Sequence, residues 1–150
     1  MEKLTSTFFY NLEKTVKVYR QYFQAQLKQN GFDITLDQWL TLKMITEYPE
    51  ASQNEIADKV FKDKASIARI IDLLEQNEYL VKYPHPKHLR KSRMVLTAKS
   101  EDVLSRLNQL VPMIRCKALH GVGEVDIHST LHVLHTIMEN CFNKDLINEL

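Results

Sequence analysis

Residues 63–77 read DKASIARIIDLLEQN, and this segment decides how the rest of the chain is interpreted. Asp63 is a favourable N-cap, because its carboxylate can accept hydrogen bonds from free amides of a first helical turn. Four aliphatic residues follow at the i, i+3, i+4, i+7 spacing of a buried helical stripe, namely Ile67, Ile70, Ile71 and Leu74. The opposite side of the first turns carries only small, polar and cationic residues: Lys64, Ala65, Ser66, Ala68 and Arg69. The sequence therefore predicts a helix with one buried face and one face suited to the major groove of DNA.

The charge of the chain is unevenly distributed. The 150 residues are 44% hydrophobic and 26% charged, which is typical of a globular domain, and the net charge is only +1. From Lys59 to Lys99, however, there are ten Lys or Arg residues and four Asp or Glu residues. A basic segment in an otherwise acidic chain is the electrostatic footprint of a polyanionic partner.

The composition also indicates a cellular setting. No apolar run approaches the roughly 20 residues that span a bilayer, and the N-terminal stretch MEKLTSTFFYNLEK lacks the apolar core of a secretory signal. The two cysteines, Cys116 and Cys141, form no CxxC pair and no disulfide framework. Each lies in an apolar helical context, which favours a buried, inert thiol over a redox sensor. We expect a cytoplasmic protein with no membrane partner.

The N-terminal helix is predicted from about Ser6 to Gln29 and ends at Asn30-Gly31. Its apolar residues recur in steps of three and four and form one long seam: Phe9, Leu12, Val16, Tyr19, Phe23 and Leu27. The seam packs either within the monomer or against a second copy. Its length and aromatic content favour at least part of it being intermolecular.

Two helices are predicted between this seam and the segment 63–77. The first runs from Leu36 to Tyr48 after a capping box of Thr35 and Gln38. The second, SQNEIADKVF, begins at a Ser52 cap, and Glu55 completes a second capping box. A brief turn, Phe61-Lys62, then precedes the segment 63–77. A short helix, a tight turn and a helix with a polar outward face make a helix-turn-helix.

Two β-type runs follow the helix-turn-helix, at Tyr79–Tyr83 (YLVKY) and Ser92–Thr97 (SRMVLT). The intervening residues 84–91, PHPKHLRK, form a polar and basic loop. Two strands around a basic tip predict a β-hairpin wing. Residues from about 35 to 97 are therefore predicted to form a winged helix-turn-helix lobe.

The C-terminal part is predicted to contain two helices, at about Ala98–His120 and Val125–Asn148, separated by a Gly-Val-Gly turn. Pro112 lies inside the first and predicts a kink or local break there. The predicted fold class is mainly α: a winged helix-turn-helix whose long terminal helices, about 6–29 and 98–148, form a dimerisation body. All of it is expected to form one domain, 1–150.

This order of elements resembles the MarR family of transcription regulators over essentially the whole chain. The most specific stretches are TLDQWLTLKMI, SQNEIADKV, DKASIARIIDLLEQN, YLVKY and RMVLTAKS; the last contains Leu96-Thr97, which matches the Leu-Thr that ends the family's wing strand. The resemblance implies a homodimer with intertwined terminal helices that binds a pseudo-palindromic operator in double-stranded DNA. It also implies a repressor whose DNA binding is modulated by a small molecule or by oxidation.

Two positions depart from the family pattern. The family's wing carries Asp-x-Arg, and Arg90 matches its Arg, but His88 stands at the Asp position. We therefore expect a more mobile wing, or a further DNA contact from His88 at lower pH. The family also favours Gly after the recognition helix. Here that position is Glu78, and Asn77 is expected to supply the left-handed turn instead.

The candidate base-reading residues lie on the outward face of residues 63–77. Arg69 can fork onto guanine, Ser66 can bond a base edge or a phosphate, and an alanine can pack on a thymine methyl. The predicted set is Lys64, Ala65, Ser66, Ala68 and Arg69. The alternative is a solvated helix face, and half or more of such contacts go to phosphate rather than to bases.

Two further groups are predicted to contact DNA. In the wing, Arg90 is expected in the minor groove, where a narrow A·T-rich groove concentrates negative potential. Its neighbours Lys87, Lys91 and Arg93 are expected to neutralise phosphates. At the start of the short helix, free amides can bind phosphate, and the candidates there are Ser52, Gln53 and Asn54.

An effector pocket is implied by the resemblance, at the junction of the dimer body and the DNA-binding lobe. Its candidate lining residues are Tyr10, Tyr19, Tyr22 and Trp39, although core packing is the favoured explanation for each. No cofactor is otherwise expected.

Three histidines of the last predicted helix, His128, His132 and His135, lie at i, i+4 and i+7. Neutral imidazoles at that spacing can share a zinc ion, and some members of the resembled family are metal sensors. Spacing alone is a weak warrant, so histidines that face water or flank an interface are preferred.

The favoured function is thus a homodimeric, sequence-specific DNA-binding regulator, a repressor modulated by an effector. The modest net charge and the missing wing Asp support an alternative, a winged-helix protein-interaction module without DNA binding. A metal-responsive regulator that uses the histidines is the other alternative. An enzyme is disfavoured, because the chain has no Gly-rich phosphate loop, no HExxH and no G-x-S-x-G motif.

Overall fold

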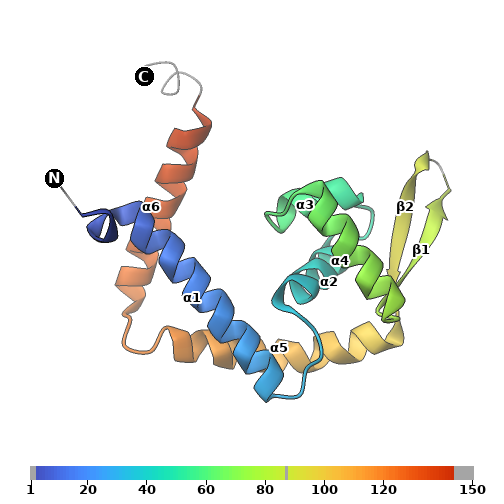
Figure 1. The fold of residues 1–150 in the computed structure, drawn as a ribbon, viewed down its shortest axis with the longest axis horizontal. Coiled ribbons are helices and arrows are strands. Elements are labelled where there is room, and N and C mark those ends of the chain that lie inside the picture. Colours follow the sequence, from blue (N-terminus) through green and yellow to red (C-terminus); the bar gives the residue numbers. More distant parts are fainter. Residues whose placement is uncertain (1–2, 87, 144–150) are drawn as a thin grey trace. The chain divides into compact units, whose positions relative to one another are not determined.

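The computed structural model describes residues 3–86 and 88–143, with the backbone only for residues 88–91. A short 3₁₀ turn, Leu4–Ser6, precedes the main elements (Figure 1), which are α1 (Phe8–Gln29), α2 (Leu36–Glu47), α3 (Gln53–Lys59), α4 (Lys64–Gln76), β1 (Leu80–His85), β2 (His88–Leu96), α5 (Ala98–Ala118) and α6 (Glu124–Phe142). They divide into two compact units, Met1–Ile114 and Arg115–Leu150. The predicted class, mainly helical with a winged helix-turn-helix, is confirmed.

Side-chain caps fix where the helices of the lobe begin. At the start of α2, Thr35 Oγ1 accepts a hydrogen bond from Gln38 N at 3.1 Å, and Thr35 N donates to Gln38 Oε1 at 2.8 Å. The same reciprocal box joins Ser52 and Glu55 before α3, with Ser52 N donating to Glu55 Oε2 at 2.7 Å. Both predicted capping boxes are confirmed, and each satisfies amides that an uncapped helix would leave free.

The core of the lobe lies beneath α4. The side chains of Ile67, Ile71 and Leu74 are fully buried, and Ile70 packs half-buried against the same core. Burying each such side chain contributes about 1.5–3 kcal/mol, so this stripe holds α4 firmly against α2 and α3. The predicted stripe is confirmed, and the opposite face of α4 is left outward.

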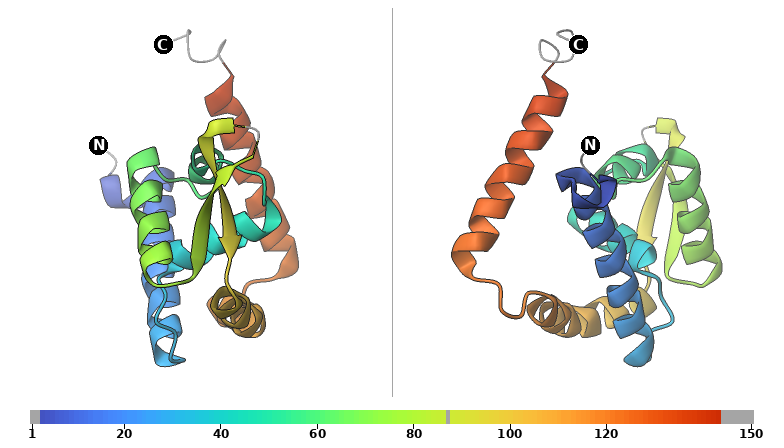
Figure 2. Two further views of the ribbon diagram at one scale, coloured as in Figure 1. Left: turned by 90° about the vertical axis from the view of Figure 1, so that its right-hand side faces the viewer. Right: turned by 60° about the vertical axis from the view of Figure 1, so that its left-hand side comes forward.

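The wing is a two-stranded antiparallel ribbon that runs beside α4 (Figure 2). Its register pairs Leu80 with Leu96, and its strands reach to a pair between His85 and His88. The predicted basic loop 84–91 is therefore wrong in extent, because most of it is strand. Pro84 is tolerated because each strand of a two-stranded ribbon has an unpaired edge, and the register is irregular between Pro84 and His85.

The turn after α4 differs from its prediction. Glu78 itself is left-handed, with φ +60°, whereas Asn77 has φ −89°, so the assignment of the left-handed turn to Asn77 is wrong. The backbone accounts for this: Glu78 N donates to the carbonyl of Glu75 at 2.9 Å and Tyr79 N to the carbonyl of Leu74 at 2.8 Å, the pattern of a helix end with a left-handed residue at this position. Thr97 Oγ1 in addition donates to the carbonyl of Glu78 at 2.7 Å. Lys99 Nζ also donates to the carbonyl of Asn77 at 2.7 Å, so the turn is held from the start of α5.

The helix α1 is buried only in its second half. Phe23 and Leu27 of the predicted seam belong to the core. Phe9 and Val16 of the same seam are more than half exposed, as is the neighbouring Phe8. Of the kink or local break predicted at Pro112, the break is wrong, because α5 continues through that residue. No described helix is long and apolar enough to cross a membrane.

The second unit contains α6 and the end of α5. No side chain of α6 is buried within the described chain, and its exposed apolar residues include Val125, Leu131 and Phe142. The end predicted for this helix, Asn148, lies outside the described residues. Cys116 and Cys141 are free and exposed, so the prediction of buried thiols is wrong for the single chain.

Candidate nucleic-acid interface

The first turn of α4 is fixed by Asp63 and Ser66. One oxygen of Asp63 accepts from Ser66 N at 2.8 Å, and the other accepts from Ser66 Oγ at 2.6 Å. The hydrogen bond from the Ser66 hydroxyl, followed by that from its amide, holds the pKa of Asp63 below its usual value. Because its proton is committed to Asp63, the Ser66 hydroxyl is left as an acceptor, and its main role is to hold the N-cap Asp63 in place.

The remaining candidates on α4 are open to solvent. Lys64, Ala65 and Arg69 are exposed, and Ala68 is half-buried. Within the described part of the chain, neither Lys64 nor Arg69 has an ion-pair partner. Their charges are therefore available to a polyanion without breaking an internal ion pair, and they lie on a helix that the core holds rigid.

A charged network that the sequence did not reveal joins the wing to α4. Lys82 of β1 contacts Asp72 at 2.7 Å and Glu75 at 2.9 Å, and its backbone amide donates to Glu75 Oε1 at 3.1 Å. Hydrogen bonds to Asp72 and then to Glu75 raise the pKa of Lys82, and the same contact with Lys82 lowers the pKa of Glu75. Both acids lie on one face of α4 at i and i+3, and this spacing is the feature of the sequence that could have indicated a cationic partner for them. The network fixes the base of the wing relative to α4.

The charges of the wing are less free than predicted. Arg93 Nη2 lies 3.8 Å from Glu50 Oε1, and His85 Nε2 lies 3.8 Å from Glu50 Oε2. Glu50 belongs to the connection between α2 and α3, so this acid ties the wing to the helix-turn-helix. Of the other predicted contacts, Lys87 lies outside the described residues, and so do the side chains of Arg90, Lys91 and His88.

The start of α3 carries the second predicted phosphate site. The hydroxyl of Ser52 donates to Glu55 Oε2 at 2.7 Å, so this side chain is committed to the capping box. Gln53 is half-buried and Asn54 is exposed. Asn54 is therefore the side chain of this group that is most open to a phosphate.

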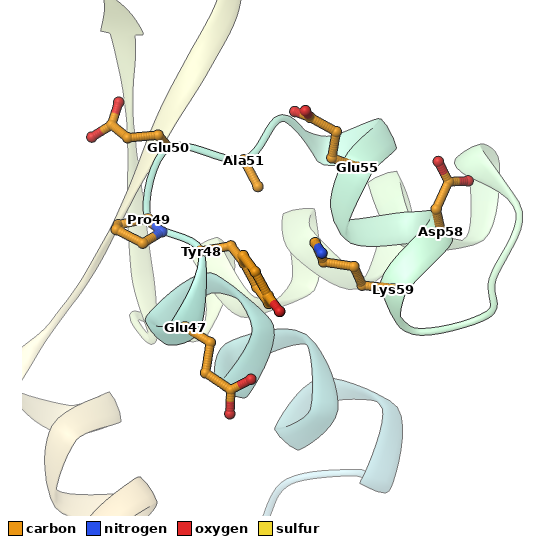
Figure 3. Close-up of a pocket in the computed structure, with 8 residues that line it drawn as sticks. All are labelled: Glu47, Tyr48, Pro49, Glu50, Ala51, Glu55, Asp58 and Lys59. Carbon is orange, nitrogen blue, oxygen red and sulfur yellow. The ribbon is translucent and has the colours of Figure 1, made fainter.

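A hollow of about 630 Å³ lies beside α3 (Figure 3). Its carboxylates are those of Glu47, Glu50, Glu55 and Asp58. Figure 3 shows Lys59 facing the ring of Tyr48, and its Nζ lies 3.6 Å from the ring centroid. A hollow with this excess of acids repels phosphate, which leaves the outward face of α4 as the surface better suited to DNA.

The aromatic candidates for an effector pocket fall into two groups. Trp39 is buried and stacks on Phe23 with a centroid distance of 5.2 Å, while Tyr19 meets Phe23 edge-on at 6.0 Å. Tyr22 packs half-buried against the same core, whereas Tyr10 is not part of it. The indole N–H of Trp39 has no hydrogen-bond partner among the described residues. A buried donor without an acceptor costs about 1–3 kcal/mol, which a bound acceptor would recover.

The predicted zinc site is not supported. His128, His132 and His135 are all exposed, and His128 Nδ1 lies 2.9 Å from the carbonyl of Glu124 in its own helix. Among residues 3–86 and 88–143, no three His, Cys, Asp or Glu side chains are grouped so that they could hold a metal ion.

Several known proteins are similar to this chain in sequence or in fold. Residues 34–92 match the model of the MarR family. A structure of BpsR from Bordetella bronchiseptica, described as regulated in its DNA binding by 6-hydroxynicotinic acid, has a TM-score of 0.82 at 14% identity and covers 92% of this chain and 97% of its own. A Listeria innocua protein of unknown function is 27% identical, with a TM-score of 0.65 and coverage of 87% and 90%.

A third solved structure is that of the transcriptional regulator PcaV from Streptomyces coelicolor in complex with its natural ligand. It has a TM-score of 0.78 at 15% identity and covers 94% of this chain and 98% of its own. At these identities the structures establish the fold, and the family model identifies the lobe itself. The winged helix-turn-helix of this chain, residues 34–92, is therefore the part that matches the model of the MarR family.

Proposed function

We propose that this chain is a sequence-specific DNA-binding transcription regulator that acts in the cytoplasm as a homodimer. The observation that carries the proposal is the outward face of α4, where Lys64, Ala65 and Arg69 are exposed on a capped and core-anchored helix. Arg69 would read a base edge in the major groove, and Lys64 would bind a phosphate. In the wing, Arg90 would enter the minor groove and Lys87 and Lys91 would bind phosphates.

The homodimer is proposed from apolar surface that a single chain leaves in water. On α1, Phe8 and Phe9 are 53% and 58% exposed, and on α6 Val125 and Phe142 are 78% and 82% exposed. Large apolar side chains exposed on two long helices support a partner surface there, and most homo-oligomers are two-fold dimers. Two α4 helices related by a two-fold axis would read half-sites about 34 Å apart, which calls for a pseudo-palindromic operator.

Repression relieved by a small molecule is the proposed mode of regulation. BpsR is described as regulated by a hydroxylated aromatic acid, and PcaV as holding a natural ligand. In this chain Tyr19, Tyr22 and Trp39 share one core, and the unpaired Trp39 N–H offers a donor to such a ligand. Binding would change the separation of the two α4 helices, so that they no longer fit successive grooves.

The test is the selection of bound fragments from a genomic DNA pool, followed by gel-shift titration of the selected sequences. The full chain should bind a two-fold sequence, and Arg69→Ala should weaken binding to the selected sequence more than to scrambled DNA. A matched control is Lys28→Ala, in the last turn of α1 and outside the proposed interface. Absence of binding in both low and moderate salt would contradict the proposal and favour a winged-helix protein-interaction module.

A further inference from the structure

Asp37 contacts both α1, which the proposed function places in the dimer, and the turn before α4, the helix proposed to read DNA. It is the second residue of α2, and each oxygen of its carboxylate has a different cationic partner. Oδ1 accepts a hydrogen bond from Nη2 of Arg20 in α1, and Oδ2 lies 3.0 Å from Nζ of Lys62. The three side chains are only 29% to 36% exposed, so water screens these contacts less than it would at an open surface.

The electrostatics of Asp37 agree with this geometry. Its partial burial alone would raise the pKa of the carboxyl, but hydrogen bonds from Lys62 and Arg20 outweigh burial and lower the pKa. The carboxylate is therefore ionised at neutral pH, and both cations contact a full negative charge.

Lys62 lies in the turn of the helix-turn-helix, immediately before the N-cap Asp63 of α4. The backbone amide of Lys62 donates to the carbonyl of Ala57 at 3.0 Å and so satisfies a carbonyl at the C-terminal end of α3. The preceding residue, Phe61, is left-handed with φ +57°, and its side chain is 93% exposed. The turn thus gains almost nothing from burying Phe61, and the ion pair of Lys62 with Asp37 attaches it to α2.

We propose that Asp37 is a positioning residue that sets the orientation of α4 relative to α1, and through it the half-site spacing that the dimer accepts. This inference rests on the proposed function, in which α1 contributes to the dimer and α4 reads DNA. A small rotation of α4 relative to α1 is doubled by the two-fold axis, because both copies rotate. A substitution of Asp37 should therefore change the preferred half-site spacing more than it changes the preferred bases, since Asp37 itself is outside the proposed DNA interface.

The experiment measures binding to the selected operator and to versions with the two half-sites one or two base pairs closer or further apart. The variants are Asp37→Asn, Lys62→Met and their combination. The control is Glu47→Gln, which likewise removes a carboxylate charge, at a surface pair with Lys43 at 3.8 Å in the same helix α2. Circular dichroism and thermal melting establish that each variant is folded, and Lys62→Met gives a second route if Asp37→Asn does not fold.

We expect Asp37→Asn to reduce the preference for the best spacing over the next one by up to about fivefold, the scale of one partly exposed ion pair. Base preference within each half-site should be retained. Lys62→Met should reduce the spacing preference in the same way. The reduction in the double variant should be less than the sum of the two single reductions, because both substitutions remove the same Asp37–Lys62 contact. Glu47→Gln should keep the wild-type profile.

An unchanged spacing profile in folded Asp37→Asn and Lys62→Met, with wild-type protein binding DNA, would overturn this inference alone. An equal loss of affinity at every spacing would also overturn it, because it would indicate a general structural role. Failure of the wild-type protein to bind any selected DNA would instead overturn the proposed function, and the inference with it.

Discussion

Thr97 and Glu78 are 19 residues apart, and the hydroxyl of Thr97 donates a 2.7 Å hydrogen bond to the carbonyl of Glu78. This bond fixes the carbonyl of Glu78, which is left-handed with φ +60° in the turn that ends α4, where Tyr79 N donates to the carbonyl of Leu74 at 2.8 Å. A residue with a side chain rarely adopts that conformation, and it persists only where surrounding contacts impose it. The end of the wing thus supports the turn in which the chain leaves α4.

Glu78→Gly should stabilise the protein, because glycine adopts a positive φ without the steric cost of a Cβ atom. We expect the free energy of unfolding to rise by about 0.5–1 kcal/mol, measured by urea denaturation. Thr97→Val should lower it by about 1 kcal/mol, because the hydrogen bond to Glu78 is removed. A matched control is Glu101→Gly in the first turn of α5, where glycine should destabilise. A loss of stability in Glu78→Gly would contradict the assignment of strain to this position.

Lys82→Met should loosen the wing from α4 without unfolding the lobe. The substitution keeps most of the apolar stem but removes the ion pairs with Asp72 and Glu75. Both acids are substantially exposed, so the loss of stability should be below about 1 kcal/mol. Amide hydrogen exchange should nevertheless accelerate in β1 and β2 while the amides of α2 stay protected.

The control for this prediction is Lys43→Met, which removes a 3.8 Å surface contact with Glu47 within α2. It should leave exchange in the wing unchanged. Equal exchange in the wing of Lys82→Met and wild-type protein would show that strand pairing alone holds the wing in place.

The contribution of Asp37 to stability should depend on pH in a defined direction. Its folded-state pKa is below the ordinary value of 3.8, so its contribution is fully present above that value and is lost as the pH falls through the folded-state pKa. Asp37→Asn should therefore lower the free energy of unfolding by about 1 kcal/mol at pH 7, and the difference from wild type should shrink below about pH 4. Urea titrations of both proteins at a series of pH values measure it. A difference that grows in acid would reverse the assigned direction of the shift.

Local rules were enough to predict the helix-turn-helix. The caps of Thr35 and Ser52 and the stripe of α4 depend on residues three or four positions apart, where sequence and geometry are directly related. Residue type misled at the turn after α4, where it favoured Asn77. The backbone hydrogen bonds that end the helix place the left-handed conformation one residue later, at Glu78. The wing loop was overestimated for a similar reason, because Pro84 interrupts most strands but not the edge of a two-stranded ribbon.

The ionic contacts of the site were beyond such rules. Arg20 and Asp37 are 17 positions apart and meet only because α1 packs beside α2. The contact between Glu50 and Arg93 likewise joins the α2–α3 connection to the wing, and it makes Arg93 a less free phosphate partner than its sequence context suggested. Charged residues on separate elements carry no periodic signal, so pairing between them follows only from the packed fold.

The two arginines of the proposed interface should respond differently to substitution, because one is placed at base edges and the other in the minor groove beside phosphates. Arg69→Ala should cost about 1–3 kcal/mol on the selected operator and relax the base preference at one position in each half-site. Arg90→Ala should weaken binding more evenly across sequences. It should also reduce the slope of log K against log salt by about 0.9 for each phosphate that a protomer no longer neutralises.

Gel-shift titrations of both variants at several salt concentrations, on the selected operator and on scrambled DNA, separate the two effects. Lys28→Ala is again the control and should change neither the slope nor the preference. The binding change in Arg69→Ala is the more informative of the two, because Arg69 lies on α4. The buried stripe of this helix leaves its backbone little freedom to move. If Arg69→Ala lowers affinity equally on both DNAs and also reduces the salt slope, Arg69 contacts the backbone. The candidates for base choice are then the other residues on the same face of the helix, Lys64, Ala65, Ser66 and Ala68.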